Sequence, residues 1–519
     1  MRRRTLVWCA AMFRYCLLPG LVLGLVANAW ADDPIPPTPG ALRAQPAAFE
    51  ASWTPVKLPT GDRMALAGFS YLVAMNEDWG VGPSVYGAAR GKMGGLFTMG
   101  MTAQRRWRVG QHGHVAASLF AGAGGGVGSD QVRFGGGLML RPELSYRVEF
   151  GSWYTGLALA HTRFPSGNVR GSSLSLVVGV TDGFFSFSPT DEGRRAAPYR
   201  RTGLGIDEVL PTVGSYRPRH SSIGRDGLPT RAAIGKAGAS LRQYITEGSW
   251  WGVEGAGAST GGNDGYMELL FSAGQDWALS APKLRAGWHA GIGLGGGGNL
   301  DTGNGWIVKT GPTLRWISPW GPSLHLEAGL MGAPSGSFKS TYTRVAIGLP
   351  LDSTARRDEV FTPTSGTVRS QALFFSYQHQ PGLRMRDGRR EDIGHLQMLF
   401  TQELSEHAYA TVRAGSAAWG SAGGYSVGLI GAGLQTSPVM KGRLNFGGGL
   451  LLGAAGGGSV AVSGGAAAQS ELWAQWRFGE QKRTRLRMAV GQWRSLRGDT
   501  QSTSTFDLSL GYAFGAVSR

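Results

Sequence analysis

The sequence predicts an all-β chain: a transmembrane antiparallel β-barrel of about 18–24 strands built from three sequence repeats. Tandem barrels of about eight strands are the alternative arrangement. Three observations support this class: the composition, an internal repeat, and apolar residues at every second position. Glycine accounts for 85 of 519 residues, tryptophan for 17, and charged residues for only 16%. After the first 31 residues, no apolar run reaches the roughly 18 residues that a transmembrane helix needs.

The N-terminus carries an export signal. Arginines at positions 2–4 precede an apolar stretch at 17–26, and Ala-Trp-Ala at 29–31 is a typical cleavage site. Residues 1–31 are therefore expected to form a cleaved signal peptide. Both cysteines, Cys9 and Cys16, lie within it. The mature chain then has no disulfide, no thiolate metal site and no cysteine nucleophile.

Glycine-rich stretches recur at 121–130, 291–300 and 451–460. A marker glycine stands roughly thirty residues before each stretch, and another roughly forty residues after it. The preceding markers are Gly95, Gly265 and Gly424, and the following ones are Gly167, Gly336 and Gly498. This spacing indicates three repeats of about 160–170 residues.

The repeats and the composition of the segments between them suggest domain boundaries. We expect repeat 1 at 32–187, an Arg/Pro-rich loop at 188–231, repeat 2 at 232–351, a loop region at 352–395 and repeat 3 at 396–519. The Arg-rich segments are interpreted as extracellular loops or as a constriction of the lumen.

Within a repeat, apolar residues alternate with small or polar ones. In the last repeat, one face would carry Phe506, Leu508, Leu510, Tyr512 and Phe514. Asp507 and Ser509 would lie on the other face. A period of two is that of a strand, so each repeat is expected to contain seven or eight strands joined by turns.

The glycine runs lie at the ends of such strands. Gly291–Gly296 also matches G-x-G-x-x-G, but no helical pattern follows it, so a phosphate-binding loop is not expected. Glycine inside a strand marks a bend or a close backbone approach, and a closed barrel needs such positions for curvature. The candidate curvature residues are Gly124, Gly125, Gly126, Gly295, Gly296, Gly297, Gly456, Gly457 and Gly458.

The stretch TSTFDLSLGYAF resembles the C-terminal strand of Gram-negative outer-membrane β-barrels. In those proteins the strand ends in an aromatic residue and is read by the barrel assembly machinery. The resemblance implies this role for Phe506, Leu508, Leu510, Tyr512 and Phe514, although five residues follow Phe514 here. It also implies integral insertion in the outer membrane, with its lipid and lipopolysaccharide as partners.

The chain is strongly basic, with a formal net charge of +17. One interpretation is an interior or loop that attracts anionic solutes or acidic polysaccharide. The other is a coding bias towards arginine that has no ligand. The candidate anion contacts are Arg194, Arg195, Arg200, Arg201, Arg217 and Arg219. Nucleic acid is not an expected partner of an exported chain.

An enzymatic alternative is a lipid-modifying hydrolase. Outer-membrane phospholipases and lipid A deacylases carry a His followed within a few residues by Ser, and His161 and Ser166 resemble that pair with a different spacing. Ser166 lies in a Pro-Ser-Gly turn, an ordinary place for serine. His112 and His114 lack a third metal ligand by spacing. We therefore predict no catalytic residue, no metal site and no cofactor.

Tryptophans near the expected strand ends suggest a belt at the membrane interfaces. They are Trp79, Trp153, Trp250, Trp251, Trp306, Trp316, Trp320, Trp473, Trp476 and Trp493. The sequence thus predicts a non-enzymatic outer-membrane channel or export pore. A lipid hydrolase and a structural or adhesive surface barrel are the alternatives.

Overall fold

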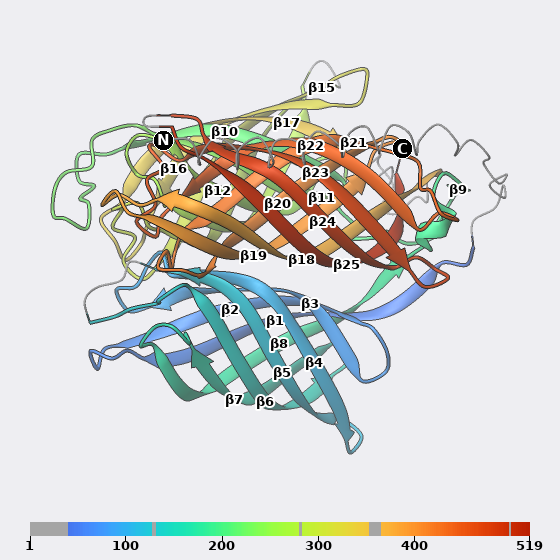
Figure 1. The fold of residues 1–519 in the computed structure, drawn as a ribbon, viewed down its shortest axis with the longest axis horizontal. Coiled ribbons are helices and arrows are strands. Elements are labelled where there is room, and N and C mark those ends of the chain that lie inside the picture. Colours follow the sequence, from blue (N-terminus) through green and yellow to red (C-terminus); the bar gives the residue numbers. More distant parts are fainter. Residues whose placement is uncertain (1–39, 127–130, 280–282, 352–364, 498–499, 519) are drawn as a thin grey trace, which may run out of the picture.

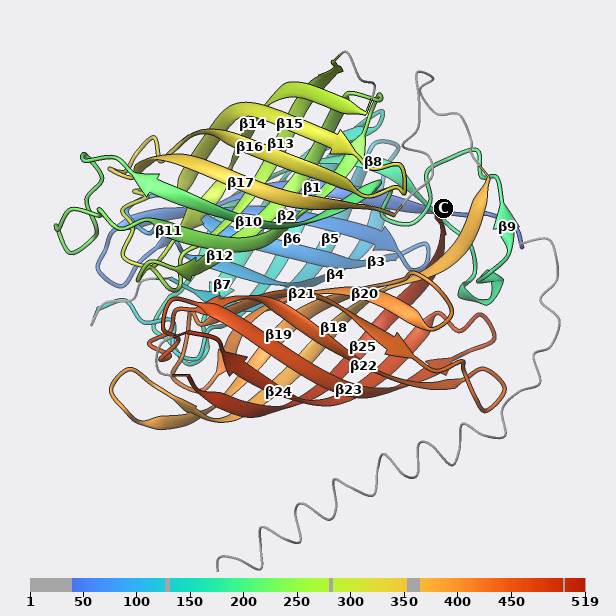
Figure 2. The same ribbon diagram turned by 90° about the horizontal axis from the view of Figure 1, so that it is seen from above.

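A computed structural model describes residues 40–126, 131–279, 283–351, 365–497 and 500–518. The expected signal peptide lies outside these residues. Within them, no helix is long and apolar enough to cross a membrane. The described chain forms antiparallel strands arranged as three barrels that lie side by side (Figures 1 and 2).

Barrel 1 is made by the first repeat. Its strands are β1 (Arg43–Lys57), β2 (Arg63–Ala74), β3 (Trp79–Arg90), β4 (Phe97–Val109), β5 (Gly113–Gly125), β6 (Leu138–Phe150), β7 (Trp153–Arg163) and β8 (Arg170–Ser186). Each strand pairs antiparallel with the next, and β1 pairs with β8, with Phe49 opposite Val180, to close the barrel.

Barrel 2 repeats this order. Its strands are β10 (Glu208–Pro218), β11 (Ile234–Tyr244), β12 (Ser249–Thr260), β13 (Met267–Ala278), β14 (Leu284–Gly296), β15 (Trp306–Ile317), β16 (Ser323–Gly332) and β17 (Lys339–Pro350). The pairing of β10 with β17 closes it.

Barrel 3 has the strands β18 (Gly366–Arg384), β19 (Arg390–Glu403), β20 (Ala408–Trp419), β21 (Ser426–Gln435), β22 (Leu444–Gly456), β23 (Ala466–Phe478), β24 (Thr484–Ser495) and β25 (Ser502–Ser518). β18 pairs with both β19 and β25 and closes the barrel. The linker between barrels 1 and 2 contributes the 3-10 turn η1 (Pro189–Asp191) and β9 (Arg195–Ala196), which pairs with the start of β18.

The predicted all-β class and the three repeats are confirmed, and the arrangement is the tandem alternative. A single barrel of 18–24 strands was wrong, because each repeat closes on itself. Because each repeat has eight strands, an even number, its first strand begins and its last strand ends at the same end of the barrel. The two strands therefore run antiparallel and can pair. Two segments expected as loops contain strands: β10 lies in 188–231, and β18 and the start of β19 lie in 352–395.

The two ends of the barrels differ. The chain enters and leaves every barrel at one end, called here the terminal end, where the turns of barrel 1 span only 75–78, 110–112 and 151–152. At the opposite, loop end the connections of barrel 1 are longer on average, spanning 58–62, 91–96, 126–137 and 164–169. Outer-membrane barrels have short periplasmic turns and longer extracellular loops. In an outer-membrane barrel, this pattern would place the terminal end on the periplasmic side.

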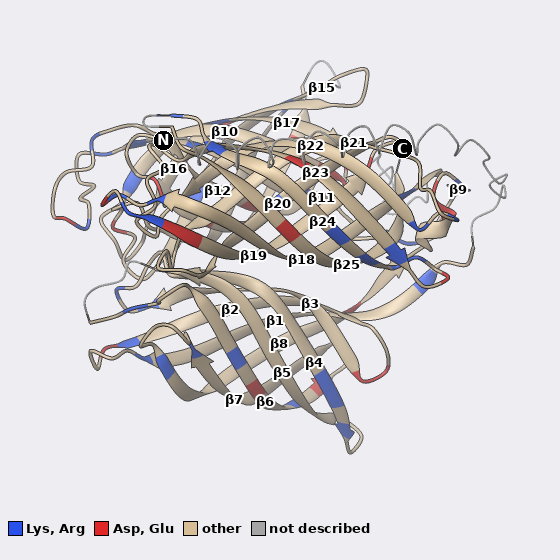
Figure 3. Ribbon diagram, in the orientation of Figure 1, with Lys and Arg blue, Asp and Glu red and all other residues tan. Residues whose placement is uncertain are grey.

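The barrels carry apolar side chains outside and polar ones inside. Leu159 in barrel 1 is 60% exposed and Leu450 in barrel 3 is 70% exposed, and both point outward. The residues between such outward positions point into the barrel. They include buried charged residues such as Arg147 of β6, which is 1% exposed. Charged positions occur singly along the strands and more densely near their ends (Figure 3). This is the pattern of a transmembrane barrel and the inverse of a soluble one.

Among the tryptophans of the expected belt, the exposed ones lie at one end of the barrels. Five of the ten predicted tryptophans are exposed, and all lie at or next to turns of the terminal end: Trp79, Trp153, Trp251, Trp316 and Trp320. By contrast, Trp250, Trp473 and Trp493 are buried and point into barrels. Period two explains the difference, because a one-residue shift moves a side chain to the other face.

Candidate functional site

The interior of barrel 1 is filled by an ion-pair network. Arg147 pairs with Glu50, which also accepts a 2.7 Å hydrogen bond from the Tyr154 hydroxyl. Arg141 lies 2.6 Å from Glu143 and donates a 2.7 Å hydrogen bond to Thr54. These side chains come from β1, β6 and β7, whose alternate residues point inward.

Barrel 2 has the longest network. Arg344 lies 2.8 Å from Glu254 and 3.2 Å from Glu327, and Arg242 lies 2.6 Å from Glu327. Lys309 also pairs with Glu254. Further pairs lie towards the terminal end, at Arg315 with Asp276, and towards the loop end, at Lys236 with Glu268.

Barrel 3 follows the same plan. Arg413 lies 3.0 Å from Asp507 and also pairs with Glu471, which binds Arg487 as well. Arginines and carboxylates occur in similar numbers in all three interiors. The interiors are therefore polar without a strong excess of either charge.

An apolar cluster closes each interior at the loop end. In barrel 1 it includes Phe120, Phe134 and Phe164, with the last two rings 5.0 Å apart. In barrel 2 it includes Tyr216, Tyr266 and Phe338, and in barrel 3 Tyr425 and Trp493. The interior of an eight-stranded barrel is just wide enough for its own side chains. A wide pore through a single lumen, which the sequence analysis assumed, is therefore not formed in this state.

The six candidate anion-binding arginines do not form one site. Arg194, Arg195, Arg200 and Arg201 lie in the linker at the terminal end, whereas Arg217 and Arg219 lie near the loop end of β10. Arg194 lies 2.6 Å from Asp191, and Arg201 pairs with Asp207. Arg217 is exposed on the outer face of barrel 2. Their binding of anions remains a prediction.

The pair His161 and Ser166 is separated. Ser166 accepts a 2.9 Å hydrogen bond from the Gly136 amide in the loop region. His161 instead lies 2.8 Å from Ser172, its cross-strand neighbour on β8. Both side chains are on the outer face of barrel 1, beside exposed leucines. Ser172 was not predicted because the sequence does not show which strand pairs with the strand of His161.

Each preceding marker glycine meets a candidate curvature glycine of another barrel. A Cβ on Gly95 would lie 2.5 Å from the Gly297 nitrogen, and one on Gly456 would lie 2.4 Å from the Gly265 nitrogen. A Cβ on Gly125 would lie 2.6 Å from the Gly424 nitrogen. These contacts join barrel 1 to 2, 2 to 3 and 3 to 1.

The three glycine contacts form a closed ring at the loop end, called here the glycine junctions. Backbone hydrogen bonds support two of them: Gly94 to Gly303 and Gly423 to Gly135, each 3.0 Å. Only glycine lets backbones approach this closely. Curvature remains a prediction for these glycines, and the structure adds a contact between barrels that the single-barrel hypothesis could not anticipate.

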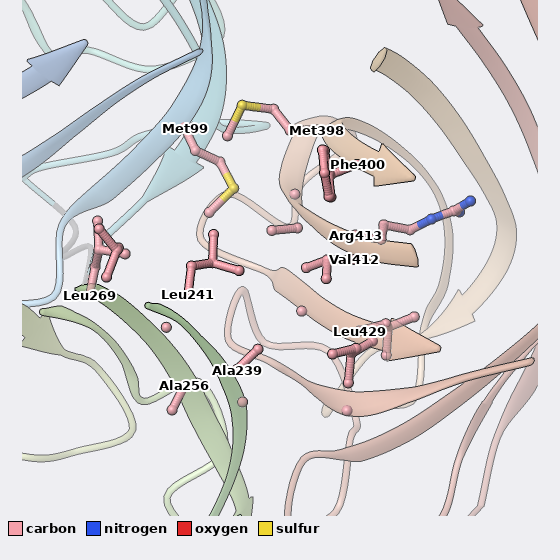
Figure 4. Close-up of a pocket in the computed structure, with 18 of the residues that line it drawn as sticks. Met99, Ala239, Leu241, Ala256, Leu269, Met398, Phe400, Val412, Arg413 and Leu429 are labelled. Carbon is pink, nitrogen blue, oxygen red and sulfur yellow. The ribbon is translucent and has the colours of Figure 1, made fainter. Parts of the chain in front are cut away.

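A cavity of about 1410 Å³ lies between the three barrels, outside all of their lumens. Figure 4 shows Met99 from barrel 1, Leu241 and Ala256 from barrel 2 and Phe400 and Leu429 from barrel 3 around this space. Five of the six glycines of the junctions, all except Gly297, border it at the loop end.

The lining of the cavity is apolar. Its two charged lining residues, Glu268 and Arg413, place their charged groups elsewhere: Glu268 pairs with Lys236 and Arg413 with Asp507, inside barrels 2 and 3. Figure 4 shows the Arg413 guanidinium pointing away from the cavity.

Aromatic residues border the cavity towards the terminal end. Phe184 from barrel 1 and Phe514 from barrel 3 pack edge to face, with ring centroids 4.9 Å apart. Tyr71, Tyr512 and Leu204 of the linker pack against them. Phe514 of the predicted assembly strand is thus buried between barrels, whereas Phe506, Leu508 and Leu510 remain exposed on the outer face.

No family model matches this chain, and no curated protein matches it. Similar solved structures include OccK2 (OpdF) of Pseudomonas aeruginosa in complex with glucuronate, at 11% identity and a TM-score of 0.23, covering 91% of this chain and 98% of that one. They also include the outer-membrane protein OpdK of the same species, at 10% identity and 0.20, covering 92% and 99%. The P. aeruginosa ferric enterobactin receptor PfeA matches at 9% and 0.27, covering 92% and 82%. These similarities are too weak to bear on function.

Proposed function

We propose that this chain is an integral outer-membrane protein of the channel class, that it is not an enzyme, and that its three lumens are shut in this state. The observation that supports the proposal is the combination of an apolar outer face with charged, ion-paired interiors. Buried charges such as Arg147 and Glu50 are expensive unless they are paired, and paired charges line the interior of each barrel.

A gate at the loop end would control conduction. In barrel 2, ion pairs extend from Arg315 near the terminal end to Lys236 near the loop end, where the cluster around Phe338 closes the interior. Displacing that cluster would connect the row of ion pairs inside barrel 2 to the solvent at the loop end. Such a path fits small ions rather than an acidic polysaccharide, which would need the single wide barrel. A preference for anions would rest on exposed arginines at the barrel ends, such as Arg200 and Arg217.

Conductance across a planar bilayer tests this function. The refolded protein should shift in gel mobility on heating, as membrane barrels do, and should conduct rarely. Phe338→Gly should increase conductance because it removes the largest apolar side chain of the loop β16–β17. The control is Leu330→Ala, an exposed position on the outer face of the same barrel. A fully soluble protein, or no current from either variant, contradicts the proposal.

A second function is favoured by the bond between His161 and Ser172. A histidine 2.8 Å from a serine hydroxyl can accept its proton and raise its nucleophilicity. This pair faces outward beside Leu159 and Leu174, where lipid would lie. The lipid hydrolase alternative would therefore use Ser172 in place of Ser166. The lipid profiles of His161→Ala and Ser172→Ala strains should then change equally, whereas Ser166→Ala should leave the profile unaltered; identical profiles in all strains exclude it.

A further inference from the structure

The space between the barrels differs chemically from the three lumens. Each lumen is lined by charged residues that find partners within the same barrel. The cavity is instead lined by outward-facing residues of β3, β4, β11, β12 and β21, which share the phase of the membrane-facing leucines. It therefore continues the apolar outer surface into the centre of the molecule, at the depth of the strand middles.

Water is a poor occupant of this cavity. The strand backbones that border it are paired with their neighbours within each barrel, as in Val253 opposite Leu241 and Val427 opposite Gly415. An ordered water needs two to four polar partners, and apolar cavities stay dry. An apolar molecule is therefore the occupant that this lining fits.

The position of the cavity narrows the occupant further. At the loop end the glycine junctions bring Gly95, Gly265 and Gly424 against the neighbouring barrels. A bulky polar head could not lie there. The terminal end, which corresponds to the periplasmic side, faces the leaflet of phospholipids. We propose that the cavity between the three barrels binds the acyl chains of a membrane phospholipid, with the head group towards the terminal end.

This inference rests on membrane insertion, as the proposed function does, but not on conduction. Bound chains would fill the centre of the molecule as an integral component and hold the three barrels together. On the outward phase of barrel 2, the small residues Ala239 and Gly255 lie beside Leu241 and Val253 and leave room at the centre.

Two glycines give a direct test. Gly255 of β12 and Gly428 of β21 both border the cavity, and a Cβ added to either would meet no atom within 4 Å. The double variant Gly255→Phe/Gly428→Phe should therefore fold and should place two rings in the space of the acyl chains. The matched control is Gly171→Phe, because Gly171 of β8 also has open space and does not border the cavity.

The measurement is the phospholipid retained per protein after purification from outer membranes in detergent, quantified by mass spectrometry. Wild type and the control should retain phospholipid at a constant ratio through extensive washing, and the double variant should retain about tenfold less. Equal retention in all three, retention of lipopolysaccharide only, or no retained lipid in the wild type would overturn the inference. Gel mobility and conductance of the same samples report separately on membrane insertion and on the channel.

Discussion

At the scale of single residues, buried charge dominates the molecule. Arg147, Arg141, Arg413 and Arg487 are among the largest fully buried side chains. Each has a carboxylate partner. Arg141 pairs with Glu143 on its own strand, whereas Arg147 pairs with Glu50 and Arg413 with Glu471 on strands more distant in sequence. Removing one partner of such a pair is costly because it leaves a buried unpaired charge, whereas replacing both partners with apolar residues costs little. The pairs between distant strands connect those strands inside a barrel.

Removing one partner should reveal this asymmetry. Glu50→Gln removes the nearer carboxylate partner of Arg147, leaving Glu143 at 3.7 Å, and should lower the free energy of unfolding by about 3–5 kcal/mol. The double variant Glu50→Leu/Arg147→Leu should lose much less. Urea unfolding in micelles measures both, with Glu77→Gln in an exposed turn as the control. Equal losses for the single and double variants would contradict the argument.

The linker offers a pH-dependent contact. Glu192 follows η1 and reaches the terminal end of barrel 3, where Glu403 lies 3.6 Å from Arg485 and 3.9 Å from Arg477. Burial, together with the neighbouring Glu403 carboxylate, raises the pKa of the Glu192 carboxyl well above its usual range. The folded state thus favours the protonated form. Its contribution to stability is complete at low pH and is lost as pH rises through the raised value.

Protease cleavage of the linker should therefore accelerate as pH rises through the raised pKa of Glu192 and the carboxyl ionises. Glu192→Gln keeps a neutral side chain at every pH and should abolish the acceleration. The protease rate on an unfolded substrate corrects for the enzyme's own pH profile. A variant that retains the full acceleration would show that another group is responsible.

At the scale of elements, the glycine-rich ends of β5, β14 and β22 do more than shape their own strands. Each ends against the loop before β21, β4 or β13 of the next barrel, so that the contact runs once around the molecule. The repeat supplies both halves of each contact. This explains why the preceding marker glycine and the glycine-rich stretch lie at a similar distance in sequence in every repeat.

Substituting one junction glycine should separate backbone strain from lost contact. Gly265 has φ +94 and its Cβ would lie 2.8 Å from Gly457, whereas Gly61 has φ +89 and open space around it. Gly61→Ala should cost about 1 kcal/mol, the usual penalty for a left-handed alanine. Gly265→Ala should cost clearly more and should speed hydrogen exchange at the loop ends of β13 and β22. Equal unfolding energies would show that the junction is unimportant.

At the scale of the whole molecule, three closed barrels share one apolar centre. Barrel 2 closes through β10 and β17 without a strand from either neighbour. Its outer face is mostly apolar, both where it meets the neighbouring barrels and elsewhere. In a barrel separated from the other two, lipid or detergent can therefore cover the surface that the neighbouring barrels contact.

Residues 206–351 alone should accordingly refold in detergent micelles as an eight-stranded barrel with heat-modifiable mobility and a strand-rich circular dichroism spectrum. Linker residues 188–205, which pair with barrel 3 through β9, are not required. A fragment that folds only when barrels 1 and 3 are added would show that the three barrels fold as one unit.

Period-two alternation and the repeat were sufficient to predict the all-β class, the three repeats and the outward face of the last strand, since these depend on local spacing. Ser172 as the partner of His161 was not predictable, because cross-strand pairing depends on register. Strand β10 was expected as part of a loop because the segment 188–231 is rich in arginine and proline. Partners inside the barrels, such as Glu50 for Arg147, are 97 residues apart and need closure to meet.

The sequence by itself determined that apolar and polar side chains alternate along strands and that the strands occur in three equivalent sets. It also determined that glycine recurs at similar positions in each set. These features follow from spacing along the chain, which is a local property. Only the tertiary structure decided that each set closes alone, that charges fill the lumens, and that the glycine junctions surround an apolar cavity. Closure and packing between barrels depend on contacts between distant residues, and a repeat of local spacing is compatible with one barrel or with three.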